Sequence, residues 1–202
     1  QQNLALDCLS AYVNAGGKGT RLAALFAADD KTGVTKSLLT IGEPPITLIE
    51  HQVNKLSGSG IGSVVVGAGN HDKAAKHVRE IYPEGSGVHP LFYADQLGTG
   101  GDLVRALRDF PELFTNYIYI TNSDVLLDID EPDFFAFHRE KGADLSIAIT
   151  TSRGVPHQDA YYIGPHDDVV HSEEATGSEQ IGPPTKKQHA YRGSSVGALI
   201  AN

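Results

Sequence analysis

The chain has 202 residues, of which 40% are hydrophobic, and its formal net charge is −9. This length buries a sizeable core and predicts one domain over residues 1–202, while no apolar run approaches membrane-spanning length. The negative charge argues against a broad nucleic-acid-binding surface. Cys8 is the only cysteine, which excludes an internal disulfide and fits a reducing, cytoplasmic compartment.

Apolar runs alternate with amphipathic stretches along the first three quarters of the chain. Pro45 suits the first turn of one predicted helix, and Asn70 is the expected cap of the next. Strand–helix alternation of this kind predicts an α/β fold with a mainly parallel sheet between two helical layers. Strands are predicted over residues 9–13, 63–67, 88–93, 117–121 and 144–150, and helices over 45–56, 70–82, after Gly101 and over 132–141.

Beyond residue 150 short strands replace the helices. They are predicted over 160–163, 169–170 and 196–201, and the polar residues 172–190 between them are expected to form a mobile loop. Because the chain begins at Gln1 and contains no methionine, we expect it to be an incomplete part of a longer protein.

The most informative stretch is the turn after the first predicted strand. Gly16, Gly17 and Gly19 allow positive φ and close approach of another group, and successive backbone N–H groups in such a turn converge on an anion. Arg21 adds a side chain that grips a phosphate with two donors. The spacing fits neither a Walker A loop nor a dinucleotide fingerprint. The turn therefore predicts a polyphosphate cradle, the alternative being an ordinary strand-to-helix turn.

Residues 15–22, Ala-Gly-Gly-Lys-Gly-Thr-Arg-Leu, resemble the signature loop of the sugar-1-phosphate nucleotidyltransferases, also called NDP-sugar pyrophosphorylases. The resemblance extends over residues 9–150. It implies a Rossmann-like, three-layer α/β/α nucleotidyltransferase domain that binds a nucleoside triphosphate and a sugar 1-phosphate and yields an NDP-sugar and pyrophosphate. By the same resemblance, the loop residues that bind the nucleotide are Ala15, Gly16, Gly17, Gly19 and Thr20.

Asp124 follows the predicted strand 117–121, at the sheet edge where α/β proteins bind ligands. A carboxylate there suits Mg²⁺, which usually takes one or two carboxylates plus phosphate oxygens, although aspartate is also a common helix cap. Residues 120–124 resemble the family's metal-binding motif, with Ser123 where glycine is more usual. Lys36, before Ser37-Leu38-Leu39, resembles the family's lysine, which with Arg21 would neutralise phosphate charge during transfer.

Residues 96–101, Gln-Leu-Gly-Thr-Gly-Gly, resemble the stretch with which the family reads the nucleotide base. Gln96 could form paired hydrogen bonds to a base edge, and Gly98 and Thr99 complete the predicted nucleotide contacts. The alternative is a glycine-rich strand-to-helix turn. These residues do not identify the base.

The resemblance weakens after residue 150. The chain has Tyr161-Tyr162 where the family usually has an aromatic–glycine pair, and it lacks the Glu-Lys-Pro motif near the sugar phosphate. Gly197 lies in a stretch similar to the family's later sugar-site strand. The alternatives are a non-catalytic regulatory or scaffold subunit and a nucleotidyltransferase for another phosphate acceptor. We expect no nucleic-acid or membrane partner, and a homo-oligomer is possible.

Overall fold

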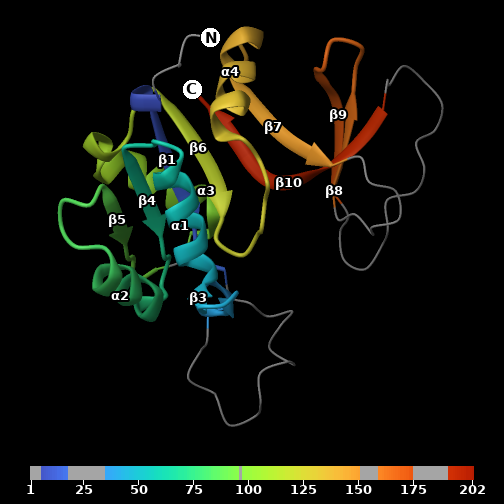
Figure 1. The fold of residues 1–202 in the computed structure, drawn as a ribbon. Coiled ribbons are helices and arrows are strands. Elements are labelled where there is room, and N and C mark those ends of the chain that lie inside the picture. The colour runs from blue at the N-terminus through green and yellow to red at the C-terminus, as the bar shows by residue number, and fades with distance from the viewer. Residues whose placement is uncertain (1–5, 18–34, 96, 151–158, 175–190) are drawn as a thin grey trace. The chain divides into compact units, whose positions relative to one another are not determined.

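The computed structural model describes residues 6–17, 35–95, 97–150, 159–174 and 191–202 (Figure 1). Backbone contacts divide the chain into two compact units, residues 1–146 with 199–202 and residues 147–198, and each unit is considered by itself. The single domain expected from the sequence stays a prediction. Among the helices in the described ranges, none is long and apolar enough to cross a membrane.

A parallel sheet forms the centre of the first unit. Its strands are ordered β5-β4-β1-β6, and Tyr12 of β1 lies opposite Val65 of β4 and Ile120 of β6. The order confirms the predicted α/β class, although the strand expected over 88–93 ends two residues early. The strand bounds are β1 Leu9–Asn14, β4 Ser63–Gly67, β5 Val88–Leu91 and β6 Tyr117–Asn122.

Helices cover both faces of this sheet, which confirms the three-layer architecture (Figure 1). Tyr12, Val65 and Ile118 form a buried cluster with Ala106 of α3 on one face. On the opposite face, Tyr119 stacks edge-on against Phe134 of α4. The helix bounds are α1 Leu48–Gly58, α2 Asp72–Ile81, α3 Gly98–Asp109 and α4 Glu131–Lys141, with short 3-10 turns η1 Leu6–Cys8, η3 Lys36–Leu38 and η4 Pro111–Leu113.

Helix α1 begins at Leu48, three residues later than Pro45 had suggested. Pro45 instead lies between the paired strands β2 (Thr40–Ile41) and β3 (Ile46–Thr47). Thr47 caps the helix in a capping box, in which its hydroxyl accepts a hydrogen bond from the Glu50 N–H and the Glu50 carboxylate accepts one from the Thr47 N–H. This capping box satisfies two of the backbone N–H groups at the start of the helix, those of Thr47 and Glu50.

Two neighbouring acidic residues at the entrance to α4 have different roles. Asp130 accepts a hydrogen bond from the Asp133 N–H at 2.9 Å and caps the helix. Glu131 is buried, and its carboxylate lies 2.6 Å from the Lys55 ammonium of α1. A buried carboxylate needs a partner of opposite charge, so this ion pair joins α1 to α4.

Helix α2 begins after His71, and neither His71 nor the expected Asn70 supplies a side-chain cap that the structure records. In the second unit, β8 (Asp159–Ile163) pairs antiparallel with both β9 (Val169–Glu174) and β10 (Tyr191–Ala201), while β7 (Leu145–Thr150) also pairs with β10. Strand β9 includes residues 172–174, which the sequence had assigned to a loop. The rest of that stretch lies outside the described residues.

The capping box of α1 gives folding a pH dependence. Burial raises the pKa of Glu50, but hydrogen bonds from the Thr47 side chain and backbone and from His77 outweigh it, so the pKa lies below its usual 4.5. A depressed pKa means that the folded state favours the carboxylate, so the stabilisation is present above pH 4.5 and is lost as pH falls through the folded-state pKa.

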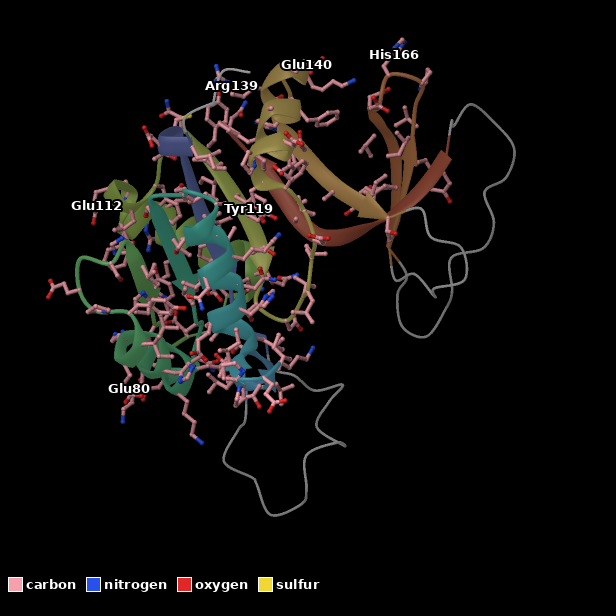
Figure 2. The ribbon with its side chains drawn as sticks, viewed as in Figure 1. Glu80, Glu112, Tyr119, Arg139, Glu140 and His166 are labelled. Atoms are coloured by element: carbon pink, nitrogen blue, oxygen red, sulfur yellow. The ribbon has the colours of Figure 1, made fainter. Side chains whose placement is uncertain are left out.

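We predict that Glu50→Ala lowers the free energy of unfolding by about 1 kcal/mol at pH 7, because hydrogen bonds to a charged acceptor are lost. The difference from wild type should shrink in urea titrations below pH 4.5. Glu140→Ala, at an exposed position of α4 (Figure 2), is the control and should show a smaller difference at pH 7. A difference for Glu50→Ala that stays constant with pH would contradict this prediction.

Candidate functional site

A pocket of about 160 Å³ opens at the carboxyl ends of β1 and β6 in the first unit. Open α/β proteins bind ligands in the crevice outside the carboxyl ends of their strands, and this pocket lies there. Its lining is mostly polar, and eight residues from three segments contribute to it: Asn14, Ala15, Gly17, Lys36, Ser37, Asn122, Ser123 and Asp124.

An ion pair crosses this pocket. The Lys36 ammonium lies 3.2 Å from the Asp124 carboxylate, and the two side chains are 24% and 35% exposed. Lys36 is the first residue of η3 and Asp124 follows the end of β6, so two segments 88 positions apart in the chain meet here. Both residues were predicted to contact phosphate or metal, and the structure places them side by side.

Asn14 and Asn122, the last residues of β1 and β6, line the pocket, and a hydrogen bond joins their side chains. The Asn14 amide donates to the Asn122 side-chain oxygen at 3.1 Å and to the Thr99 hydroxyl at 3.2 Å. The Gly16 N–H donates to the Asn14 side-chain oxygen at 3.4 Å. Asn14 therefore connects the glycine loop, β6 and the start of α3. Sequence reasoning did not select either asparagine, although both end strands at the predicted ligand edge.

Gly16 and Gly17 have different surroundings. A Cβ atom on Gly16 would lie 3.2 Å from the backbone of Gly69, which itself has a φ of +53°. Among the described residues, nothing lies within 4 Å of a Cβ atom placed on Gly17. Gly16 thus packs closely against the loop after β4, whereas Gly17 lines the pocket.

The glycines after Leu97 form the first turn of α3, not a turn that precedes the helix. Gly98 has a φ of +78°, a conformation that favours glycine. The Leu97 N–H donates to the buried Asp102 carboxylate at 3.2 Å, which holds the chain at the helix start. Thr99 contacts the pocket residue Asn14, so one residue of the predicted base-reading segment is connected to the pocket.

The structure brings Ala15, Gly17, Lys36 and Asp124 into one pocket, with Gly16 buried behind it. Gly197 lies in β10, within the second unit. Four of the predicted site residues lie outside the described residues, so their contacts stay predictions: Gly19, Thr20, Arg21 and Gln96.

The pocket's chemistry fits a magnesium ion shared with a phosphate ligand. Asp124 is the carboxylate among the residues that line it, and the described ranges hold no cluster of three or more metal-ligating side chains. A closed site made only of protein ligands would need such a cluster, whereas Mg²⁺ commonly takes one or two carboxylates and completes its shell with phosphate and water.

The family model described as nucleotidyl transferase matches residues 11–164. The chain belongs to this family. The match covers the pocket described above and the parallel sheet apart from the first two residues of β1. Together with the relatives below, it confirms the resemblance to the sugar-phosphate nucleotidyltransferases.

Among curated relatives of this nucleotidyl transferase chain is a mannose-1-phosphate guanyltransferase of Schizosaccharomyces pombe, 29% identical over 144 residues, which are 70% of this chain and 38% of the relative. A mannose-1-phosphate guanylyltransferase catalytic subunit beta of Dictyostelium discoideum is 27% identical over 95% of this chain and 48% of its own. The chain thus spans less than half of the length of these relatives.

A solved structure of HddC from Yersinia pseudotuberculosis, described as complexed with GMP-PN, has a TM-score of 0.70 and 18% identity to this nucleotidyl transferase chain. The alignment covers 95% of this chain and 76% of HddC. At this identity the similarity shows the fold, and it agrees with the Rossmann-like architecture derived from the strand order.

The contrast between the two glycines gives a prediction. Gly16→Ala should lower the free energy of unfolding by about 1–3 kcal/mol, because the added methyl group overpacks the contact with Gly69. Gly17→Ala should stay within about 0.5 kcal/mol of wild type, since none of the described residues lies within 4 Å of its methyl group. Chemical denaturation of the two variants under one set of conditions provides the comparison. Equal losses in both would contradict the assignment of Gly16 to packing.

Proposed function

We propose that this chain supplies the nucleotide and sugar-phosphate site of a sugar-phosphate guanylyltransferase. The observation that carries the proposal is the Lys36–Asp124 pair, held at 3.2 Å beside the glycine loop in one polar pocket. The reaction would be attack by a phosphate oxygen of the sugar 1-phosphate on the α-phosphorus of GTP. A new P–O bond forms, the bond from the α-phosphorus to the oxygen bridging to the β-phosphate breaks, and pyrophosphate leaves.

The residues of the pocket would act by binding and by charge. Lys36 has three N–H donors, of which Asp124 uses one, so the ammonium could also donate to phosphate oxygens. The open space at Gly17 would let a phosphate group approach the backbone closely. Phosphoryl transfer depends chiefly on positioning and on charges aimed at the reacting oxygens, and the pocket offers both.

Asp124 would also hold Mg²⁺. The bound ion would neutralise charge that develops on the phosphate oxygens and on the leaving pyrophosphate. With its carboxylate on the metal, Asp124 would leave Lys36 free to contact the phosphates. Arg21, predicted from the sequence as the second phosphate-binding cation, would donate two further hydrogen bonds to the same phosphates.

The choice of base and sugar rests on the names of the relatives. Several curated relatives are mannose-1-phosphate guanyltransferases, so GTP and mannose 1-phosphate are the first substrates to test. The pocket described above contains phosphate-binding groups, which do not distinguish one base from another. A cytoplasmic location, favoured by the single cysteine, and a homo-oligomeric state are retained as parts of the proposal.

The test is a panel of sugar 1-phosphates against the four nucleoside triphosphates, read as pyrophosphate release with and without Mg²⁺. We expect release with GTP and mannose 1-phosphate that stops when the metal is removed. Binding of nucleotide without turnover in any combination would instead favour a non-catalytic subunit. Turnover with an acceptor other than a sugar phosphate would overturn the substrate class.

We predict that Asp124→Asn lowers kcat by about 10²–10³-fold, because the amide loses the charge that would hold the metal. The exposed Asp128, which lies four residues further along and does not line the pocket, gives the control Asp128→Asn, expected to keep near-wild-type kcat. Steady-state kinetics at saturating substrates measures kcat, and circular dichroism checks that both variants are folded. Full activity in folded Asp124→Asn would remove this residue from the metal site.

A further inference from the structure

Asp124 is held from both sides, and one of the two supports comes from a helix. Before it, the Ser123 N–H donates to the Asn14 carbonyl of β1 at 3.0 Å. After it, the side-chain amide of Gln52 in α1 donates to the Val125 carbonyl. Gln52 is only 3% exposed, so this polar contact is made in the protein interior. Residues 125–130 form neither helix nor strand, and the contact with Gln52 satisfies the first of their carbonyl groups.

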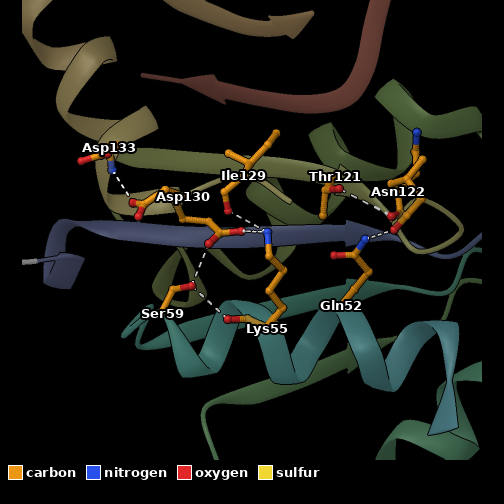
Figure 3. A network of polar contacts seen from close by, with 10 residues as sticks. Gln52, Lys55, Ser59, Thr121, Asn122, Ile129, Asp130 and Asp133 are labelled. Carbon is orange, nitrogen blue, oxygen red and sulfur yellow. Dashed lines mark hydrogen bonds and ion pairs between the residues drawn. The ribbon is translucent and has the colours of Figure 1, made fainter. Parts of the chain in front are cut away.

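The same face of α1 continues this support along the segment toward α4. The Lys55 ammonium donates to the Ile129 carbonyl at 2.8 Å and pairs with Glu131 at 2.6 Å. The Ser59 hydroxyl donates to the other carboxylate oxygen of Glu131 at 2.8 Å. Figure 3 shows Gln52, Lys55 and Ser59 projecting from the helix toward this segment. Residues 125–130, which have no regular secondary structure, are thereby connected to helix α1.

Lys36 is tied to the same helix. The Leu48 N–H, at the first residue of α1, donates to the Leu39 carbonyl at 2.8 Å, and the Leu39 N–H donates to the Lys36 carbonyl at 3.1 Å. Leu48 and Gln52 are four positions apart, about 6 Å along the helix axis. The segments that carry the two charged side chains are therefore anchored on successive turns of one helix.

We propose that α1 sets the spacing of Lys36 and Asp124, and that Gln52 is the positioning residue for Asp124. This inference rests on the function proposed above, because it assigns Gln52 a role toward the metal and phosphate site. Gln52 lies outside the pocket lining and acts through the Val125 backbone. Loss of its hydrogen bond would free the chain after Asp124 while the bond before Asp124 stays in place.

The test uses Gln52→Met, which keeps an unbranched side chain but cannot donate a hydrogen bond. Mn²⁺ replaces Mg²⁺, and the paramagnetic resonance signal of free Mn²⁺ reports binding in the presence of GTP, without sugar phosphate and hence without turnover. We expect a Mn²⁺ affinity at least about 10-fold weaker than in wild type, as for other residues that orient a metal ligand. In turnover, kcat should fall while the KM for GTP changes little.

Ser59→Ala is the matched control, because Ser59 is the C-cap of α1 and its hydroxyl bonds Glu131, the first residue of α4, which directly follows the same segment. It should lower the melting temperature about as much as Gln52→Met and leave Mn²⁺ affinity unchanged. If Gln52→Met does not fold, Gln52→Asn provides the same test, since its shorter side chain cannot reach Val125.

Unchanged Mn²⁺ affinity in the Gln52 variants, with an active wild type, would overturn this inference alone. An equal loss of Mn²⁺ affinity in Ser59→Ala would also overturn it, because the contacts would then act only through general stability. A wild-type chain that takes up no Mn²⁺ with GTP and releases no pyrophosphate would overturn the proposed function, and this inference with it.

Discussion

The proposed site depends on the 3.2 Å contact between Lys36 and Asp124. A pair whose side chains are 24% and 35% exposed contributes little to folding, because water competes for both charges. Its geometry is nevertheless fixed by several buried elements. Strand β6 delivers Asp124 to the sheet edge, β1 holds the residue before it, and α1 supports both segments through Leu48 and Gln52. A weakly stabilising contact held this firmly suggests a role in binding, which is the basis of our functional proposal.

The parallel sheet makes this arrangement possible because it gathers distant segments at one edge. The register of β1 against β6 places Asn14 directly opposite Asn122, and their side chains join in a hydrogen bond. The register of β1 against β4 places Asn14 opposite Gly67, so the loops that follow these strands meet. Gly16 packs tightly at that crossing, since a Cβ atom there would lie 3.2 Å from the Gly69 backbone. The glycine loop thus has two functions: one glycine allows packing, and another leaves space in the pocket.

Sequence reasoning predicted the strands well, since buried parallel strands are continuous apolar runs such as 63–67 and 117–121. It also selected Lys36 and Asp124, because local motifs surround them. It failed where the deciding contact is distant in the chain. The buried Glu131 is one case, because its partner Lys55 lies 76 positions away. The roles of Asn14, Asn122 and Gln52 depend on strand register and helix packing. Pro45 suggested that the helix begins there, but the helix begins after the capping box at Thr47.

A double-mutant cycle on the charged pair tests the central claim most directly, namely that Lys36 and Asp124 act together on the same phosphates and metal. The values of kcat/KM for pyrophosphate release would be compared for wild type, Lys36→Met, Asp124→Asn and the double variant. Residues that act as a unit give strongly non-additive losses. We expect the double variant to be no more than about 3-fold worse than the poorer single variant. Losses that multiply in the double variant would show two independent contributions and would contradict the claim.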